Sequence, residues 1–126
     1  MRYALLIYTD QSSWDSMTDE EKAAGRAEDL PRWYALFDEL KKADPNAGGM
    51  ELEAAGEAKV VKIRDGRTIV TDGPYAETKE VIGGVFLVEL PDLDEAIRLA
   101  ALVPAAQHGS LEIRPVLDVT VPEAAA

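Results

Sequence analysis

The chain has 126 residues, of which 47% are apolar and 29% charged, as expected for one soluble domain. It has no cysteine, which excludes disulfides, thiol nucleophiles and thiolate metal sites, and its net charge of −11 disfavours nucleic acid as a partner. No apolar run approaches the roughly 20 residues that span a bilayer and no signal-peptide cleavage site follows the start, so we expect a cytoplasmic protein without a membrane segment.

The N-terminal part of the chain predicts a strand and a long helix. Residues 2–9 are apolar on both alternating sets of side chains, so a strand here has to be covered on both faces. A polar loop is expected over residues 10–17. Thr18 and Glu21 then form a capping box that opens a helix, and Pro31 is expected to break or kink it.

Apolar side chains recur at helical spacing in the second part of this helix, which begins near Asp29. Such a stripe faces a core. Combined with the later elements, the pattern predicts five large core residues: Trp33, Phe37, Leu40, Phe86 and Ile97.

The middle of the chain predicts a loop, a short strand and a hairpin. Pro, Asn and Gly mark residues 43–49 as a loop, and residues 50–54 alternate weakly as a strand. Residues 59–64 and 67–71 are strand-like runs joined by Asp65 and Gly66, a favoured two-residue turn. The mixed polarity of the two runs predicts a half-exposed flap.

A polar nonapeptide follows the hairpin, and we call it the 72–80 loop: Asp72-Gly73-Pro74-Tyr75-Ala76-Glu77-Thr78-Lys79-Glu80. Asp can bond the backbone two residues on, Gly tolerates positive φ, and Pro fixes its own φ, so this start predicts a rigid turn. A rigid turn can hold polar side chains in place, as a binding site requires. The alternative is a plain strand connection with solvated charges.

The C-terminal third predicts a strand, a helix and a final strand. Residues 81–90 are apolar on both faces near their centre, and Gly83 with Gly84 would allow a bulge or a close backbone approach. Asp92 and Glu95 form a second capping box for a helix that ends near Pro104. The last strand covers residues 111–119, and Pro115 marks it as an edge strand or a bulged one.

The order of these elements predicts a single α+β domain over residues 1–121, with a flexible tail at 122–126. Strand, helix, strand, hairpin, strand, helix, strand is a ferredoxin-like plan with an inserted hairpin and both helices on one face of an antiparallel sheet. The other face is apolar and bare, so we expect a homodimer in which two sheets meet as a dimeric α+β barrel.

The 72–80 loop, the following Gly83-Gly84 pair and residues 112–116 near the end resemble the DGPF-domain branch of the YCII-related proteins. The likeness runs from Tyr3 to about Asp118, and Tyr75 replaces the usual Phe. This resemblance implies a dimeric α+β barrel, a cleft beside each sheet and a largely unassigned biochemical role. Some DGPF proteins are linked to extracytoplasmic-function sigma factors.

Other YCII-related members carry a histidine early in the first long helix, paired with an aspartate in the active site proposed for them. This chain has Trp33 near that place, so the resemblance does not extend to a histidine-centred mechanism. The one histidine, His108, is expected in a surface turn away from the 72–80 loop and without a catalytic role.

Charged residues gather in the 72–80 loop, and its polar side chains are the candidates for ligand binding: Asp72, Tyr75, Glu77, Lys79 and Glu80, with Arg114 approaching from the last strand. A carboxylate near a lysine can do acid–base chemistry when buried. The same residues can instead form a salt-bridge network that pins the loop or the dimer. No catalytic residue is assigned, and neither a metal site nor a cofactor is expected.

Two functions therefore stay open. The first is binding or transformation of a small molecule in a cleft beside the 72–80 loop. The second is a non-enzymatic accessory or regulatory role, in which an acidic surface contacts a protein partner such as a sigma factor. A deep cleft would favour the first, and a flat acidic patch without a cleft would favour the second.

Overall fold

The computed structural model describes residues 1–76 and 78–118, so Glu77, residue 119 and the predicted 122–126 tail lie outside it. The last strand, predicted over residues 111–119, ends earlier, at Pro115. The elements in chain order are β1 (Arg2–Asp10), α1 (Gln11–Asp15), α2 (Asp19–Ala43), β2 (Gly48–Glu51), the 3₁₀ turn η1 (Ala55–Glu57), β3 (Lys59–Arg64), β4 (Arg67–Asp72), β5 (Glu80–Glu89), α3 (Leu93–Leu102), the 3₁₀ turn η2 (Pro104–Gln107) and β6 (Ser110–Pro115).

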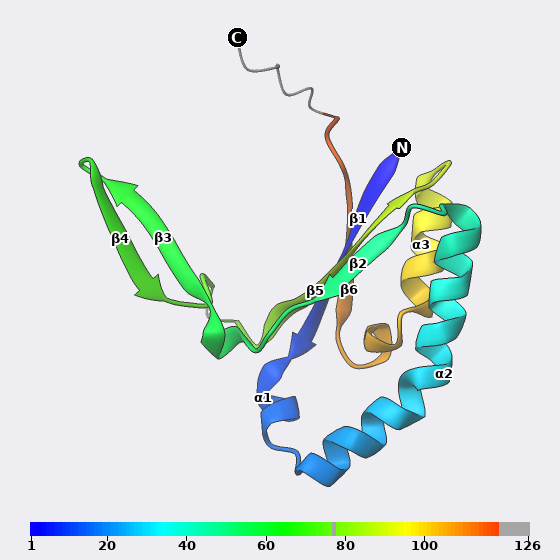
Figure 1. Ribbon diagram of the computed structural model, residues 1–126, viewed down its shortest axis with the longest axis horizontal. Coiled ribbons are helices and arrows are strands. Elements are labelled where there is room, and N and C mark those ends of the chain that lie inside the picture. The colour runs from blue at the N-terminus through cyan, green and yellow to red at the C-terminus, as the bar shows by residue number, and fades with distance from the viewer. Residues whose placement is uncertain (77, 119–126) are drawn as a thin grey trace.

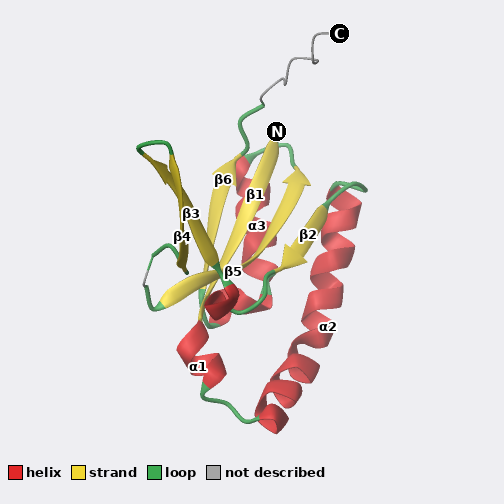
Figure 2. Ribbon diagram, turned by 60° about the vertical axis from the view of Figure 1, so that its left-hand side comes forward, coloured by secondary structure: helices red, strands yellow, loops and turns green. Residues whose placement is uncertain are grey.

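Four strands form one antiparallel sheet in the order β2-β5-β1-β6, and β3 pairs with β4 in a separate two-stranded sheet. Helices α2 and α3 lie on one side of the four-stranded sheet, and the β3–β4 hairpin projects away from it (Figures 1 and 2). The predicted ferredoxin-like α+β fold with an inserted hairpin is confirmed. In the described residues the other sheet face is covered by no helix.

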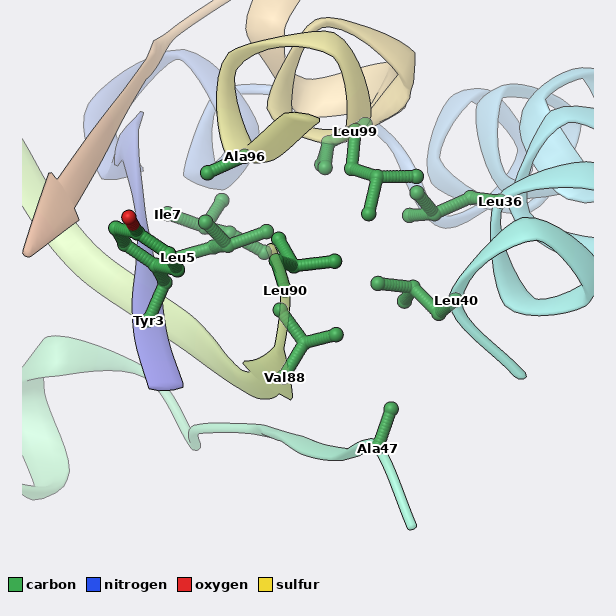
Figure 3. Close-up of a cluster of buried hydrophobic side chains, with 11 residues drawn as sticks. Tyr3, Leu5, Ile7, Leu36, Leu40, Ala47, Val88, Leu90, Ala96 and Leu99 are labelled. Carbon is green, nitrogen blue, oxygen red and sulfur yellow. The ribbon is translucent and has the colours of Figure 1, made fainter. Parts of the chain in front are cut away.

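The core lies between the sheet and the two helices. Alternate residues of β1, namely Tyr3, Leu5 and Ile7, point toward the helices, and Leu5 is fully buried. In Figure 3, Val88 and Leu90 lie between these side chains and Leu36 and Leu40 of α2, with Ala96 and Leu99 of α3 above. Because strand side chains alternate, the intervening residues of β1 face the open side.

The predicted core list is correct in part. Leu40 is buried, and Trp33 and Phe86 are half-buried against the core, but Phe37 is 41% and Ile97 51% exposed. In each helix a neighbouring residue takes the inward position, Leu36 in α2 and Ala96 in α3. Phe37 instead lies on the flank of α2, with its ring 5.9 Å from that of Trp33 and 6.2 Å from that of Phe86.

Helix α2 begins as predicted but continues through its proline. The Thr18 hydroxyl accepts from the Glu21 N–H at 3.1 Å and the Glu21 carboxylate accepts from the Thr18 N–H at 3.0 Å, which confirms the capping box. Pro31 lies inside one continuous helix, which bends along its length in Figure 1. Loss of one N–H therefore does not end the helix, because packing of Leu36 and Leu40 supports its second half.

Two local predictions need correction. The expected polar loop after β1 contains the short helix α1, because the Asp10 carboxylate accepts from the N–H groups of Ser12 and Ser13 at 3.1 and 3.3 Å. At α3, Asp92 caps the helix by accepting from the Glu95 N–H at 2.9 Å. The Glu95 carboxylate bonds to Arg98 instead of completing the predicted capping box.

The irregularities expected in the strands are present. The pairing of β1 with β5 skips from Ile7–Gly84 to Tyr8–Ile82, so Gly83 is the extra residue of a β-bulge. Strand β6 is an edge strand, which agrees with Pro115 at its end. In the hairpin, Asp65 and Gly66 have φ of 52° and 73°, the positive values that the predicted two-residue turn requires.

We predict that Leu5→Ala lowers the free energy of unfolding by about 2–5 kcal/mol, because a fully buried side chain is replaced by a cavity. Urea denaturation measures the change. The matched control is Leu117→Ala, since Leu117 is largely exposed and its loss should change stability little. Equal midpoints for both variants would contradict the placement of the core.

Asp44 ties the end of α2 to the sheet, and this tie should depend on pH. Its carboxylate accepts from the N–H groups of Glu89 and Asn46, both at 2.9 Å, and these bonds lower the pKa of Asp44 below its ordinary value. A lowered pKa means that the stabilisation is present above the ordinary pKa and is lost as pH falls through the folded-state pKa.

We therefore expect Asp44→Asn to reduce the acid-dependent loss of stability between neutral pH and about pH 3. Thermal unfolding across this range, compared with the wild type, measures the effect. The control is Asp65→Asn, which removes a carboxylate in the exposed hairpin turn and leaves the junction of α2 with the sheet intact. Parallel profiles for the wild type and Asp44→Asn would argue against the tie.

Candidate functional site

A cavity of about 490 Å³, half open to solvent, lies where β1 ends and β5 begins. Its walls come from Tyr8 of β1, the segment around η1, the 72–80 loop and the start of β5. The lining residues are Tyr8, Leu52, Glu53, Ala54, Ala55, Glu57, Ala58, Pro74, Tyr75, Ala76, Thr78, Glu80, Val81 and Ile82. Most of them are apolar, so the cavity is a candidate site for a small organic molecule.

Two hydrogen bonds position polar groups at this cavity. The Tyr8 hydroxyl donates to the Glu112 carboxylate at 3.1 Å, and the Ser110 hydroxyl donates to the Glu80 carboxylate at 3.0 Å. The bond to Glu112 is the main cause that raises the pKa of Tyr8 above its ordinary value, with partial desolvation adding to it. Tyr8 therefore keeps its proton at neutral pH.

The charges around the cavity are mainly negative. Among its described lining residues, carboxylates come from Glu53, Glu57 and Glu80, phenols come from Tyr8 and Tyr75, and there is no Lys, Arg or His. Such a lining favours a cationic or neutral ligand over an anion.

The start of the 72–80 loop is held against η1 by a close backbone approach. The Gly73 N–H donates to the Ala58 carbonyl at 2.8 Å, and a Cβ at position 73 would lie only 2.9 Å from the Ala58 Cβ. The Asp72 carboxylate forms an ion pair with Lys59. In the described residues positive φ occurs at Asp65 and Gly66, so Gly73 is needed for space and not for the expected positive φ.

The structure brings two of the predicted site residues to the cavity. Tyr75 and Glu80 line it, and Lys62 Nζ lies 5.3 Å from the centre of the Tyr75 ring. Glu77 lies outside the described residues.

The other three candidates form ion pairs outside the lining. Asp72 pairs with Lys59, Lys79 lies 3.8 Å from the Asp10 carboxylate, and Arg114 lies 3.4 Å from the Glu112 carboxylate. These pairs are largely exposed and each contributes little to stability. They agree with the alternative in which charges anchor the loop.

Sequence reasoning missed two parts of the cavity wall. For Tyr8 the sequence predicts only a place in a strand, and for residues 52–58 only the end of a weak strand and a connection to the hairpin. The available signal for Tyr8 was its alternation with Leu5 and Ile7, which places its phenol on the open sheet face beside Glu112 of β6. Nothing in residues 52–58 signalled a binding wall, because η1 depends on contacts with the distant 72–80 loop.

His108 and Trp33 are both outside this cavity. His108 is exposed at the end of η2, as expected for a surface turn, although Ser110 two residues later bonds to Glu80, so the turn adjoins the end of the 72–80 loop. Trp33 packs on Phe37 and on Phe86, whose ring centre is 6.3 Å away. The residue near the position of the histidine of other members thus supports packing.

Within residues 1–76 and 78–118, no cluster of three or more His, Asp or Glu side chains is arranged to hold a metal ion. The helices of this same part of the chain include none with the length and apolar character required to cross a bilayer.

Comparison with known proteins supports the family resemblance. The YCII-related domain matches residues 1–120. The chain belongs to the YCII-related family. A relative from Rhizobium meliloti (strain 1021), an uncharacterised protein, is 36% identical over 120 residues, which is 91% of this chain and 91% of that protein.

We predict that Glu112→Gln lowers the pKa of Tyr8, because the neutral amide no longer favours the protonated phenol. Spectrophotometric titration of tyrosinate in this YCII-related protein measures the change, and the same substitution in a Tyr8→Phe background identifies the phenol responsible. Identical titration curves with and without Glu112→Gln would rule out the Tyr8–Glu112 bond in solution.

Proposed function

We propose that this protein binds a small organic molecule in the cavity between Tyr8, Tyr75 and Glu80. The observation that carries the proposal is a concave, mostly apolar cavity with a few convergent polar groups, which is the usual form of a small-molecule site. Its concave, half-open form differs from the flat patch expected for the alternative, in which an acidic surface contacts a protein such as a sigma factor.

The charges of the lining define the class of ligand. The three carboxylates repel an anion and attract a cation, while Lys62 already lies over the ring of Tyr75. The apolar remainder of the lining favours a ligand with an apolar body. A compact amine with an aromatic or aliphatic group fits these requirements.

Binding explains the geometry better than catalysis does. The raised pKa of Tyr8 makes it a hydrogen-bond donor and not a base at neutral pH. The lone imidazole, His108, is absent from the lining. The cavity residues thus supply shape, charge and hydrogen bonds, the properties of a ligand sensor or carrier.

The open face of the sheet supports the homodimer that the family resemblance implies. Met50, Ile82 and Leu87 are exposed there, beside the half-buried Leu6 and Val85. A second copy would cover this apolar face in an isologous interface and bury more than roughly 1,000 Å² in total. We further propose that the protein is a cytoplasmic homodimer of the DGPF branch.

Two probes of opposite charge test the ligand class. Benzylamine is a cation at neutral pH and benzoate is an anion, and both carry one aromatic ring. We expect benzylamine to bind in the millimolar range and benzoate to bind at least about tenfold more weakly, as measured by ligand-observed and protein-observed NMR.

Variants locate the binding. Glu80→Gln removes one carboxylate and Tyr75→Ala one ring, so each should weaken benzylamine binding by about three- to tenfold. The matched control is Glu20→Gln at the exposed start of α2, which should leave binding unchanged. Preference for benzoate, or binding that ignores Glu80 and Tyr75, would refute the proposed site.

A further inference from the structure

The β3–β4 hairpin is the part of the described fold with the fewest internal partners. Its strands pair only with each other, and every residue in them is exposed except the half-buried Val60. Figures 1 and 2 show it projecting away from the helices and the four-stranded sheet. An isolated two-stranded hairpin is marginally stable in water, so its stability requires a further contact.

One face of the hairpin is apolar. Val61 lies opposite Val70 in the register, and alternation places Ile63 on the same face. These three side chains are 61%, 59% and 66% exposed, respectively. Three neighbouring branched side chains in water form a surface suited to packing against another apolar surface.

The charge of the hairpin identifies the kind of surface that it fits. Residues 59–72 contain four basic and two acidic side chains, which leaves 9 of the 13 basic and 22 of the 24 acidic residues for the rest of the chain. Alternation places Lys62, Arg64 and Arg67 together on the face opposite the apolar one. That basic face is complementary to a second, acidic copy of the chain, and the apolar face can then pack on the apolar open sheet face of that copy.

The hairpin is also joined directly to the cavity. Ala58 precedes β3 and Pro74 follows β4, and both line the cavity. The Gly73–Ala58 bond and the Lys59–Asp72 pair close the base of the hairpin between them. A contact that orders the hairpin therefore also orders this wall of the cavity.

We propose that the β3–β4 hairpin is an arm that packs on a second copy of this chain, and that this contact completes the ligand cavity at its base. The inference rests on the homodimer and ligand site proposed above. It adds that dimerisation and ligand binding are coupled. Because coupling is reciprocal, benzylamine should strengthen the dimer by the same factor by which the dimer strengthens benzylamine binding.

The first experiment replaces the apolar side chains of the arm and preserves the pairing of β3 with β4. The arm variant combines Val61→Thr, Ile63→Thr and Val70→Thr, since Thr keeps a high strand propensity. Its matched control is Ile69→Thr, on the opposite face of the hairpin. Analytical ultracentrifugation should show the dimer weakened by about tenfold or more in the arm variant only. Benzylamine binding should weaken with it.

A second variant separates the arm from the sheet interface. Leu87→Asp places a charge on the open sheet face, away from the arm, and should disrupt the dimer through that face. Circular dichroism and the NMR signals of Leu5 and Leu99 verify that each variant keeps the helix–sheet core.

Cross-linking then tests where the arm lies. The chain has no cysteine, so Ile63→Cys provides a single attachment point for a maleimide-linked benzophenone. In a mixture of isotopically heavy and light protein, we expect cross-links between heavy and light chains. Glu20→Cys on α2 serves as the control and should give far fewer of them.

Several outcomes would overturn the proposal, and they are distinguishable. If Leu87→Asp dissociates the dimer and the arm variant does not, the proposed role of the arm is refuted and the sheet interface is supported. If the wild type is a monomer at micromolar concentration and still binds benzylamine, the arm contact and the dimer are both refuted and the ligand site is supported. A monomer whose arm binds a labelled oligonucleotide would assign the arm to nucleic acid.

Discussion

The central position of β1 in the sheet is the constraint on which the rest of the molecule depends. Among the described strands, β1 alone is paired on both sides along most of its length, with β5 and β6. Its alternation divides the molecule in two. Tyr3, Leu5 and Ile7 form the core with the helices, whereas Leu6 and Tyr8 form the open face and the edge of the cavity.

Much of the fold was predictable because its signals are local. The Thr18 capping box, the Asp65-Gly66 turn and the alternation in the strands each depend on residues within a few positions of one another. At Pro31 the helix bends without breaking, because tertiary packing supports its second half. The loop expected after Asp10 was wrong because a side-chain cap opens α1 there. Phe37 and Ile97 were misplaced because a helical stripe identifies a side of the helix but not its centre.

The candidate site was less predictable because it is built from segments far apart in the sequence. Tyr75 and Glu80 were found from the polar 72–80 loop, and both line the cavity. Tyr8 and residues 52–58 were not found, since their role depends on the backbone contact between Gly73 and Ala58 and on the bond between Tyr8 and Glu112. Asp72, Lys79 and Arg114 were proposed from charge density and form ion pairs outside the lining of the cavity.

The β-bulge at Gly83 changes which set of alternate side chains of β5 faces the helices. By strict alternation Glu80 and Ile82 would share a face with Phe86 and Val88, which pack toward the helices. The one additional residue reverses the phase, so Ile82 lies opposite Tyr8 and Glu80 opens to the cavity. A single strand can thus serve the core at one end and the cavity at the other, and a substitution that straightened the bulge would exchange the two faces without changing any side chain of the site.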